Sequence, residues 1–254
     1  EGKTLIAQRG LTTDAGGNAG ETFSTGFLAA GTPITAIAVS NATSEFSNAL
    51  VVAPQSLWSG NGATSKWSEG ANWVGGVAPA AGNHLVFGPG TSATSVNDFA
   101  PGTMFESISY VGGDHTVTGN RVALGNTGLT ATAGTHTLDL DFNIDPICNP
   151  IVVEFGSRLI VSGVLSGPGG LHKDGVGQLV LSGANTYAGV THVAEGELRV
   201  LHASALGSTA LGTELMGGTL VLQGGISVAG ESLAIDPGPA EIHSVSGANT
   251  WTGA

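Results

Sequence analysis

Apolar and polar positions alternate in short runs along the second half of the chain, and these runs recur at a nearly constant interval. The clearest runs are GQLVL at 177–181, GELRV at 196–200 and GTLVL at 218–222. Alternate side chains of such a run fall on one face of a strand, because successive side chains point to opposite faces. One aliphatic residue anchors each run, and the anchors recur every 19 to 22 residues: Val117, Leu138, Leu159, Leu179, Leu198, Leu220 and Ile242.

A repeat of about 20 residues built from short strands and glycine- or asparagine-containing turns cannot bury its apolar face alone. Stacked as successive coils about 4.8 Å apart, the repeats pair their strands in parallel and enclose one continuous core. Residues 115–254 contain no apolar stripe with a helical period. The pattern therefore predicts an all-β chain that folds as a parallel β-helix of about ten coils.

The segment GPGGLHKDGVGQLVLSGANTYAGVTHVAEGELRV at 167–200 resembles the autotransporter-associated β-strand repeat, also called the passenger-associated transport repeat. The residues that match the repeat pattern are Gly169, Gly170, Leu171, Lys173, Gly175, Gly177, Leu179, Leu181, Ser182, Gly183, Asn185, Thr186, Tyr187, Gly189, Thr191, Val193, Gly196 and Leu198. His172, Gln178 and Val190 depart from it, since they stand where small or hydroxyl residues are commoner. Upstream, residues 58–88 resemble the tryptophan-bearing segment that precedes such repeats in large bacterial surface proteins.

This resemblance implies a right-handed parallel β-helix that is exported to the cell surface or beyond and has a structural or adhesive role. It implies no defined catalytic chemistry. The β-helix is expected over residues 58–254. Residues 1–57 resemble no known family, and we expect them to form an additional N-terminal β segment or an end cap.

Composition and charge narrow the function classes further. Of 254 residues, 42 are glycine and only 10% are charged, which is typical of a chain dominated by paired strands. The net charge of −12, without clustered cations, argues against nucleic acid and anionic lipid as partners. Apolar runs such as ALVVA at 49–53 are too short to insert into a membrane as a helix. Cys148 is the single cysteine, so no intramolecular disulfide forms, and we expect a small buried side chain.

The acidic sequence DLDFNID holds the candidates for metal or catalytic chemistry. Asp139 and Asp141 are expected on one outward strand face, roughly 6.5–7 Å apart by the strand rise, and Asp145 follows. Three interpretations stay open: a solvated face, a weak Ca²⁺ site, and a carboxylate pair for glycoside hydrolysis. Arg158, expected beside Asp139 one coil away, or Arg199 would assist a polysaccharide lyase, whereas the competing interpretation is a surface ion pair. No cofactor other than Ca²⁺ is expected.

Aromatic and imidazole side chains form two further groups. Trp58, Trp67 and Trp73 lie close together in sequence, and their indole faces could stack on sugar rings or could instead seal one end of the β-helix. His115 and His136 occupy equivalent positions of successive repeats, so we expect them to stack as a ladder. Stacked imidazoles without a third ligand are more often a packing feature than a zinc site.

The octapeptide SGANTYAG at 182–189 returns as SGANTWTG at 246–253. We interpret both copies as a turn-and-strand seam on the same side of the β-helix, three coils apart. The second copy, with Asn249 and Trp251, ends the sequence without a capping helix, so we expect this end to associate with another copy of the chain or with more of a longer chain. Such head-to-tail contacts build filaments.

These observations predict a non-catalytic structural protein that is secreted or held at the cell surface. It would act in adhesion or in head-to-tail assembly into extracellular fibres, with self-association and surface glycans as its expected partners. The alternative is a carbohydrate-binding or polysaccharide-degrading β-helix that uses Asp139, Asp141 and an arginine, or the tryptophan group. No nucleic acid partner and no membrane insertion are expected.

Overall fold

The computed structural model describes residues 54–90, 93–144 and 149–253, together with four short strands in the preceding segment. The contacts divide the chain into two units, Glu1–Pro54 and Gln55–Ala254. In the first unit, β1 (Pro33–Ile34) pairs antiparallel with β4 (Leu50–Val51), and β2 (Ile37–Val39) pairs antiparallel with β3 (Ser44–Phe46). Whether this unit caps the β-helix stays a prediction.

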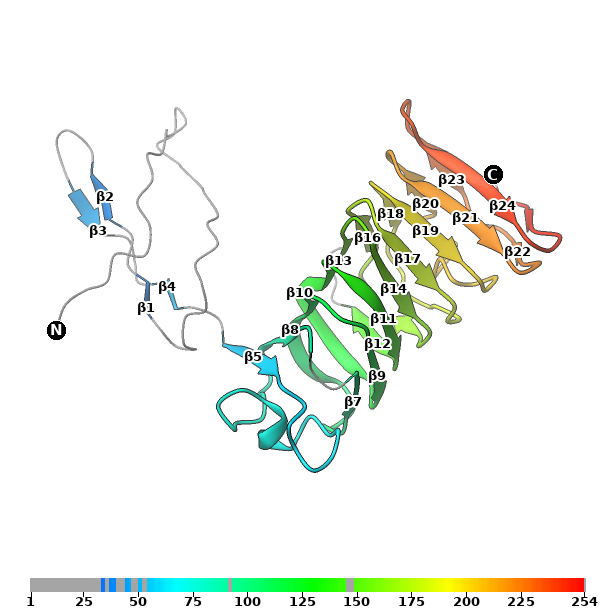
Figure 1. Ribbon diagram of the computed structural model, residues 1–254. Helices are drawn as coiled ribbons and strands as arrows, with labels where there is room; N and C mark the ends of the chain where they lie inside the picture. The colour runs from blue at the N-terminus through cyan, green and yellow to red at the C-terminus, as the bar shows by residue number, and fades with distance from the viewer. Residues whose placement is uncertain are drawn as a thin grey trace. The chain divides into compact units, whose positions relative to one another are not determined.

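The second unit is a solenoid whose strands stack into two long sheets (Figure 1). The 11-stranded sheet, called here the first sheet, contains β5 (Gln55–Trp58), β6 (His84–Phe87), β8 (Thr103–Tyr110), β10 (Val122–Ala131), β12 (Phe142–Ile144), β13 (Asn149–Val153), β15 (Leu165–Ser166), β16 (Leu171–Asp174), β18 (Thr191–Val193), β20 (Thr213–Leu215) and β23 (Leu233–Ile235). The 8-stranded sheet, called the second sheet, contains β7 (Thr94–Asn97), β9 (His115–Gly119), β11 (Gly134–Asp139), β14 (Ser157–Val161), β17 (Gln178–Leu181), β19 (Glu197–Val200), β21 (Thr219–Gln223) and β24 (Glu241–Val245).

Parallel pairing runs through both sheets, from β5 with β6 to β20 with β23 and from β7 with β9 to β21 with β24. A short third sheet pairs β22 (Ser227–Val228) with β25 (Thr250–Trp251), also in parallel. The predicted all-β parallel solenoid is therefore confirmed, but it makes about seven turns and not ten. Near the start, residues 59–83 form a long connection that contains the 3-10 helix η1 (Gly70–Asn72) in place of a regular coil.

The register between strands corrects one step of the predicted anchor series. Leu138 pairs with Val161, and Leu159 pairs with His136. The anchors before and after this step are aligned as predicted, with Val117 beside Leu138 and Leu179 beside Leu198. The coil between β11 and β14 is longer than its neighbours: His136 and Leu159 are 23 residues apart, whereas Leu159 and Leu179, partners at the next step, are 20 apart. The inward row of the second sheet therefore begins with two histidines and continues with aliphatic residues: His115, His136, Leu159, Leu179, Leu198, Leu220 and Ile242.

The core lies between the sheets and follows the period-two pattern. The first sheet contributes an inward row composed of Leu85, Ile108, Leu129, Ile151, Lys173, Val193, Leu215 and Ile235. Lys173 is fully buried in this row of aliphatic side chains. At the end of the solenoid, Ile235 and Ile242 occupy inward positions but are 51% and 40% exposed, because no further coil covers them within the described residues.

Short turns lead from the first sheet to the second, for example from β13 to β14, from β16 to β17 and from β18 to β19. Gly156, Gly175 and Gly196 each lie in one of these turns with φ between 63° and 75°, a left-handed conformation that glycine adopts at little cost. No helix among the described residues has the length and apolar character that crossing a membrane requires.

Candidate functional site

Asp139 and Asp141 flank the buried Leu140 at the end of β11, and both side chains are exposed. Asp139 Oδ1 accepts a hydrogen bond from Ser162 Oγ at 2.9 Å, and Asp141 Oδ1 accepts one from the Val164 backbone N–H at 2.8 Å. Both carboxylates therefore accept hydrogen bonds from the turn at residues 162–164 of the following coil. Asp145, the third carboxylate of the predicted group, lies outside the described residues.

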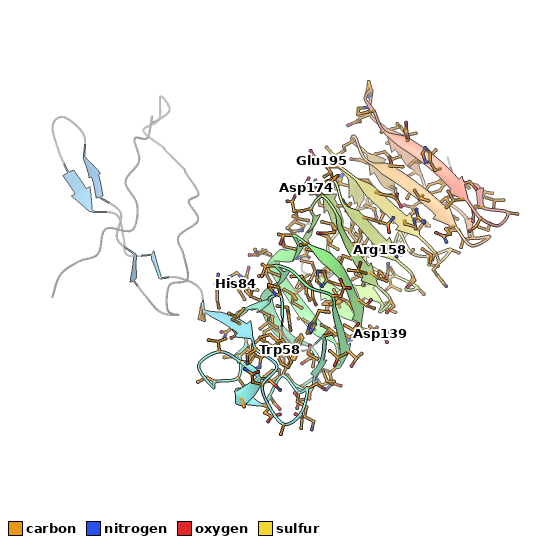
Figure 2. The ribbon with its side chains drawn as sticks, viewed as in Figure 1. Trp58, His84, Asp139, Arg158, Asp174 and Glu195 are labelled. Atoms are coloured by element: carbon orange, nitrogen blue, oxygen red, sulfur yellow. The ribbon has the colours of Figure 1, made fainter. Side chains whose placement is uncertain are left out.

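The predicted stacking of Asp139 beside Arg158 is wrong. Arg158 pairs in register with Thr135 and Gln178, whereas Asp139 pairs with Thr118. Figure 2 labels both side chains and shows them at separate places on the solenoid. The physical reason is the longer coil between β11 and β14, which places Arg158 opposite Thr135, four residues before Asp139 on the same strand.

Arg199 is engaged on its own strand and on the next. Its Nε donates to Glu197 Oε1 at 2.7 Å, and its Nη1 donates to Gln223 Oε1 at 2.8 Å. Gln178 also donates to Glu197 Oε1, so four polar residues form a chain across neighbouring coils: Gln178, Glu197, Arg199 and Gln223. Arg199 thus forms an ion pair within its own strand, which is not the Asp–Arg pair between coils that the sequence raised.

Trp58, Trp67 and Trp73 come together at the start of the solenoid, and each is at most 2% exposed. The rings of Trp58 and Trp73 meet edge to face with centroids 5.1 Å apart, and Trp67 meets Phe105 in the same way at 5.7 Å. A sugar ring stacks only on an exposed indole face, so glycan stacking on these residues does not fit their burial. Sealing one end of the β-helix, the other interpretation, does fit it.

His115 and His136 are partners in register, as the sequence predicted. Both are buried, and each ring also packs on an aromatic ring of the first sheet: His115 on Phe87 at 4.6 Å and His136 on Tyr110 at 4.3 Å. Burial lowers the pKa of His136, while its hydrogen bond to the Ala133 carbonyl opposes that shift. Among the described residues, no three histidine, cysteine or acidic side chains are placed to hold a metal ion.

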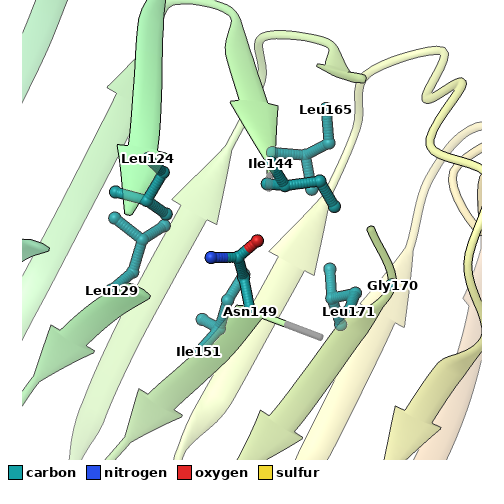
Figure 3. Close-up of a pocket in the computed structure, with 8 residues that line it drawn as sticks. All are labelled: Leu124, Leu129, Ile144, Asn149, Ile151, Leu165, Gly170 and Leu171. Atoms are coloured by element: carbon teal, nitrogen blue, oxygen red, sulfur yellow. The ribbon is translucent and has the colours of Figure 1, made fainter. Parts of the chain in front are cut away.

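A small apolar recess lies inside the solenoid beside β13 (Figure 3). Its lining is formed by Leu124, Leu129, Ile144, Asn149, Ile151, Leu165, Gly170 and Leu171. Asn149 is its polar member; its Nδ2 donates to the Gly125 carbonyl at 2.7 Å, while its Oδ1 is buried without a partner among the described residues. One amide among aliphatic side chains gives this recess no convergent set of polar groups for catalysis.

Residues 167–200, singled out by the sequence, form more than one complete coil, and two side chains bind that coil to its neighbours. Lys173 projects inward, and its Nζ donates to the carbonyls of Asp174, Gly175 and Glu195 at 2.9, 2.5 and 3.0 Å. Glu195 belongs to the next coil, so this ammonium joins two successive turns. Burial lowers the pKa of Lys173 to about 8, and the carboxylates of nearby acidic residues, first of all Asp174, oppose that shift.

Asn185 forms hydrogen bonds to the coil before its own and to the coil after it. Its Oδ1 accepts the Leu165 backbone N–H at 2.8 Å, and its Nδ2 donates to the Ala205 carbonyl at 2.6 Å. Tyr187, two residues later, is fully buried and its hydroxyl bonds to Thr191 Oγ1 at 2.5 Å. The SGANTYAG segment is therefore a structural seam of the solenoid, as interpreted from the sequence.

The second copy of that octapeptide lies at the open end. Asn249 Oδ1 accepts the backbone N–H groups of Gly225 and Ile226 at 2.8 and 3.0 Å. Trp251 pairs with Val228 and is half-buried against the core. The copies follow β17 and β24, which are three strands apart in the second sheet, so the expected separation of three coils is confirmed.

A protein-family model described as Passenger-associated-transport-repeat matches residues 171–200. The chain carries a passenger-associated transport repeat. Lys173, Asn185 and Tyr187 all lie within this repeat, so its sequence pattern coincides with the contacts that tie one coil to the next. No solved structure matches the chain.

A curated relative extends the resemblance beyond the passenger-associated transport repeat. The chain is 33% identical over 153 residues to the Adhesin BmaC autotransporter of Brucella suis biovar 1 (strain 1330). The alignment covers 53% of this chain and 4% of the adhesin. The chain therefore corresponds to a small fraction of that relative's length.

Sequence reasoning identified Lys173 as a match to the passenger-associated transport repeat but assigned it no role. The signal was present, because Lys173 stands two residues after Leu171. A strand places residues two apart on the same face, so both side chains point inward. A lysine there implies that its ammonium group finds acceptors inside the fold. The turn carbonyls that supply them could be located only from the three-dimensional structure.

Proposed function

We propose that the chain is a non-catalytic module of a secreted or cell-surface adhesin. The proposal is carried by one observation: a parallel solenoid with a passenger-associated transport repeat aligns with an autotransporter adhesin. Each coil repeats the same backbone path, so outward side chains form rows along the solenoid. Such extended surfaces suit binding to partners more than catalysis, which needs a few convergent groups in a concave site.

An adhesion assay tests this function. Fluorescent beads coated with the full chain are expected to bind cultured epithelial cells more than albumin-coated beads do, and soluble chain is expected to compete. Equal binding of both kinds of bead would contradict adhesion.

Catalysis is tested separately by incubating the chain with neutral and anionic polysaccharides and measuring new reducing ends or unsaturated products. We expect no turnover. Cleavage that disappears in Asp141→Asn would contradict a non-catalytic module and would favour the polysaccharide-degrading alternative.

Head-to-tail assembly is a further part of the proposal, and the open end of the solenoid supports it. Strands β23 and β24 terminate their sheets, and each therefore has one edge that no other described strand pairs. Ile235 and Ile242 are partly exposed beside these edges. An unpaired strand edge with apolar side chains favours addition of another strand.

Light scattering across a concentration series tests assembly. We expect the mass to rise with concentration and the rise to be reduced in Ile242→Lys, which places a charge at the open end. Val77→Lys, at an exposed apolar residue in the connection before β6, is the matched control. A monomer at every concentration would contradict assembly of this chain.

A further inference from the structure

The short turns between the first and second sheets form a row along one edge of the solenoid. The residues at their tips, called here the turn row, are Val111, Ala133, Phe155, Val176, Glu195 and Met216. The turns are in register because backbone hydrogen bonds join each to the coil before it, for example Glu154 to Ala131 at 2.8 Å and Met216 to Val193 at 2.9 Å.

Apolar side chains of the turn row point into solvent. Phe155 is 85% exposed, Val176 55%, Met216 47% and Val111 46%. Single exposed apolar residues are ordinary on a protein surface. These four lie on stacked turns along one edge of the solenoid, and groups of exposed apolar residues mark interaction sites.

The backbone does not require apolar residues at these tips. The left-handed conformations of the turns belong to the neighbouring glycines, Gly156 beside Phe155 and Gly175 beside Val176. Turn tips usually hold polar residues, which hydrogen-bond to water or to the turn itself. Glu195 shows that a charged residue fits the row, so the apolar tips contribute nothing that the fold needs.

Carboxylates accompany the apolar tips. Glu154 and Glu195 are exposed, and Asp174 precedes the turn of Val176; Figure 2 shows Asp174 and Glu195 near each other on this edge. The positive charge closest to them, on Lys173, is buried beneath the turns and bound to backbone carbonyls. A partner therefore meets apolar groups set among negative charges.

We propose that the turn row docks an extended, positively charged protein segment whose apolar side chains lie against Phe155 and Val176. This inference rests on the proposed adhesive function, for which it names the contact surface and the chemistry of the partner. Rungs about 4.8 Å apart give the row a length of about 24 Å, which an extended segment of about seven residues spans.

Charge selects this partner over others. The chain carries a net charge of −12, so the acidic edge repels an anionic membrane and also a second copy that would dock along this edge, as distinct from the open end of the solenoid. Alternating cationic and apolar side chains, by contrast, match both features of the row.

A peptide-binding experiment tests the proposal. The probe is a fluorescent peptide of about eight residues that alternates lysine and leucine, and binding to the full chain is followed by polarisation at several salt concentrations. Control peptides replace leucine with serine or lysine with glutamate. We expect the lysine–leucine peptide to bind tightest and its affinity to fall with salt.

Variants locate the site. Phe155→Ser with Val176→Ser is expected to weaken binding about tenfold or more, equivalent to about 1.4 kcal/mol, and Glu154→Gln with Glu195→Gln is expected to weaken it and to reduce the salt dependence. Leu211→Ser is the matched control, because Leu211 is 57% exposed in the connection between β19 and β20. Circular dichroism melting checks that each variant folds.

The outcomes separate this inference from the proposed function. Equal binding of the lysine–serine peptide, unchanged binding by Phe155→Ser with Val176→Ser, or no peptide binding at all would overturn the turn row as the docking surface. If bead adhesion to cells persists in any of these cases, the adhesive function stands. Loss of cell adhesion by the same double variant, with Leu211→Ser unaffected, would support both.

Discussion

Asn185 and Asn249 make the same hydrogen bond from the two copies of one octapeptide: each amide oxygen accepts a backbone N–H of the preceding coil, from Leu165 and Ile226 respectively. Their amide nitrogens differ. Asn185 Nδ2 donates forward to Ala205, whereas Asn249 Nδ2 donates to residues of its own turn, such as Ser246 at 3.1 Å, and to the preceding coil. The same side chain thus joins three coils inside the solenoid and two at its end.

Because of this difference, we expect removal of the two amides to lower the free energy of unfolding by unequal amounts. Asn185→Ala leaves two buried backbone groups without partners, so we expect the free energy of unfolding to fall by about 2–4 kcal/mol. Asn249→Ala affects a more exposed site and is expected to cost about 1 kcal/mol. Urea unfolding measures both. Equal costs would show that the forward bond to Ala205 contributes little to stability.

Lys173 predicts a pH dependence of stability. Its pKa is lowered by burial to about 8 in the folded chain, against about 10.5 in an unfolded one. Between these values the unfolded chain binds more protons, so this residue makes the free energy of unfolding rise as pH rises from about 8 to about 10.5. Urea unfolding across this range checks the slope.

Lys173→Met is the matched variant for that slope, since methionine fills the inward row without a titrating group. We expect it to remove the rise and, at pH 7, to lower the free energy of unfolding by about 1–3 kcal/mol, because carbonyls of Gly175 and Glu195 lose their donor. The same slope in the variant would assign the pH dependence to other groups.

The sequence was sufficient to predict the solenoid because the period-two pattern and the repeat interval are both local signals. The register between β11 and β14 could not be predicted this way. Leu159 and Val161 are both inward-facing aliphatic residues, and either continues the pattern opposite Leu138. Only the length of the intervening coil decides between them.

The candidate site was less predictable than the fold. Aspartates and tryptophans attract attention by their chemistry, yet Asp141 holds a turn and Trp67 is buried. Phe155 gave no signal in the sequence, because whether an apolar residue lies inside or at a turn tip depends on where the strand ends. The exposed edge it forms with Val176 arises from the stacking of separate coils.

Calcium is expected to bind weakly or not at all at Asp139 and Asp141. One oxygen of each carboxylate already accepts a hydrogen bond from the following coil, so a calcium ion would compete with Ser162 and Val164. Thermal melting with millimolar Ca²⁺ and with EDTA should give the same midpoint. A rise with Ca²⁺ that Asp141→Asn abolishes would instead establish a calcium site.

In the tryptophan cluster, we expect Trp73→Phe and Trp58→Phe to lower the free energy of unfolding by different amounts. Trp73 Nε1 donates to the Trp67 carbonyl at 2.7 Å, whereas Trp58 Nε1 is buried without a hydrogen-bond partner among the described residues. Trp73→Phe loses ring contacts and leaves a buried carbonyl unpaired, so we expect it to lower the free energy of unfolding by about 2–4 kcal/mol.

Trp58→Phe loses a similar amount of ring contact but also removes an unpaired N–H, whose burial is itself unfavourable. We therefore expect a smaller loss, about 1 kcal/mol or less. Urea unfolding followed by far-ultraviolet circular dichroism compares the two variants without relying on tryptophan fluorescence. A larger loss for Trp58→Phe than for Trp73→Phe would contradict this prediction. It would show that the Trp58 indole N–H has a hydrogen-bond partner in solution, which stabilises the fold in addition to the ring contacts with Trp73 and Phe87.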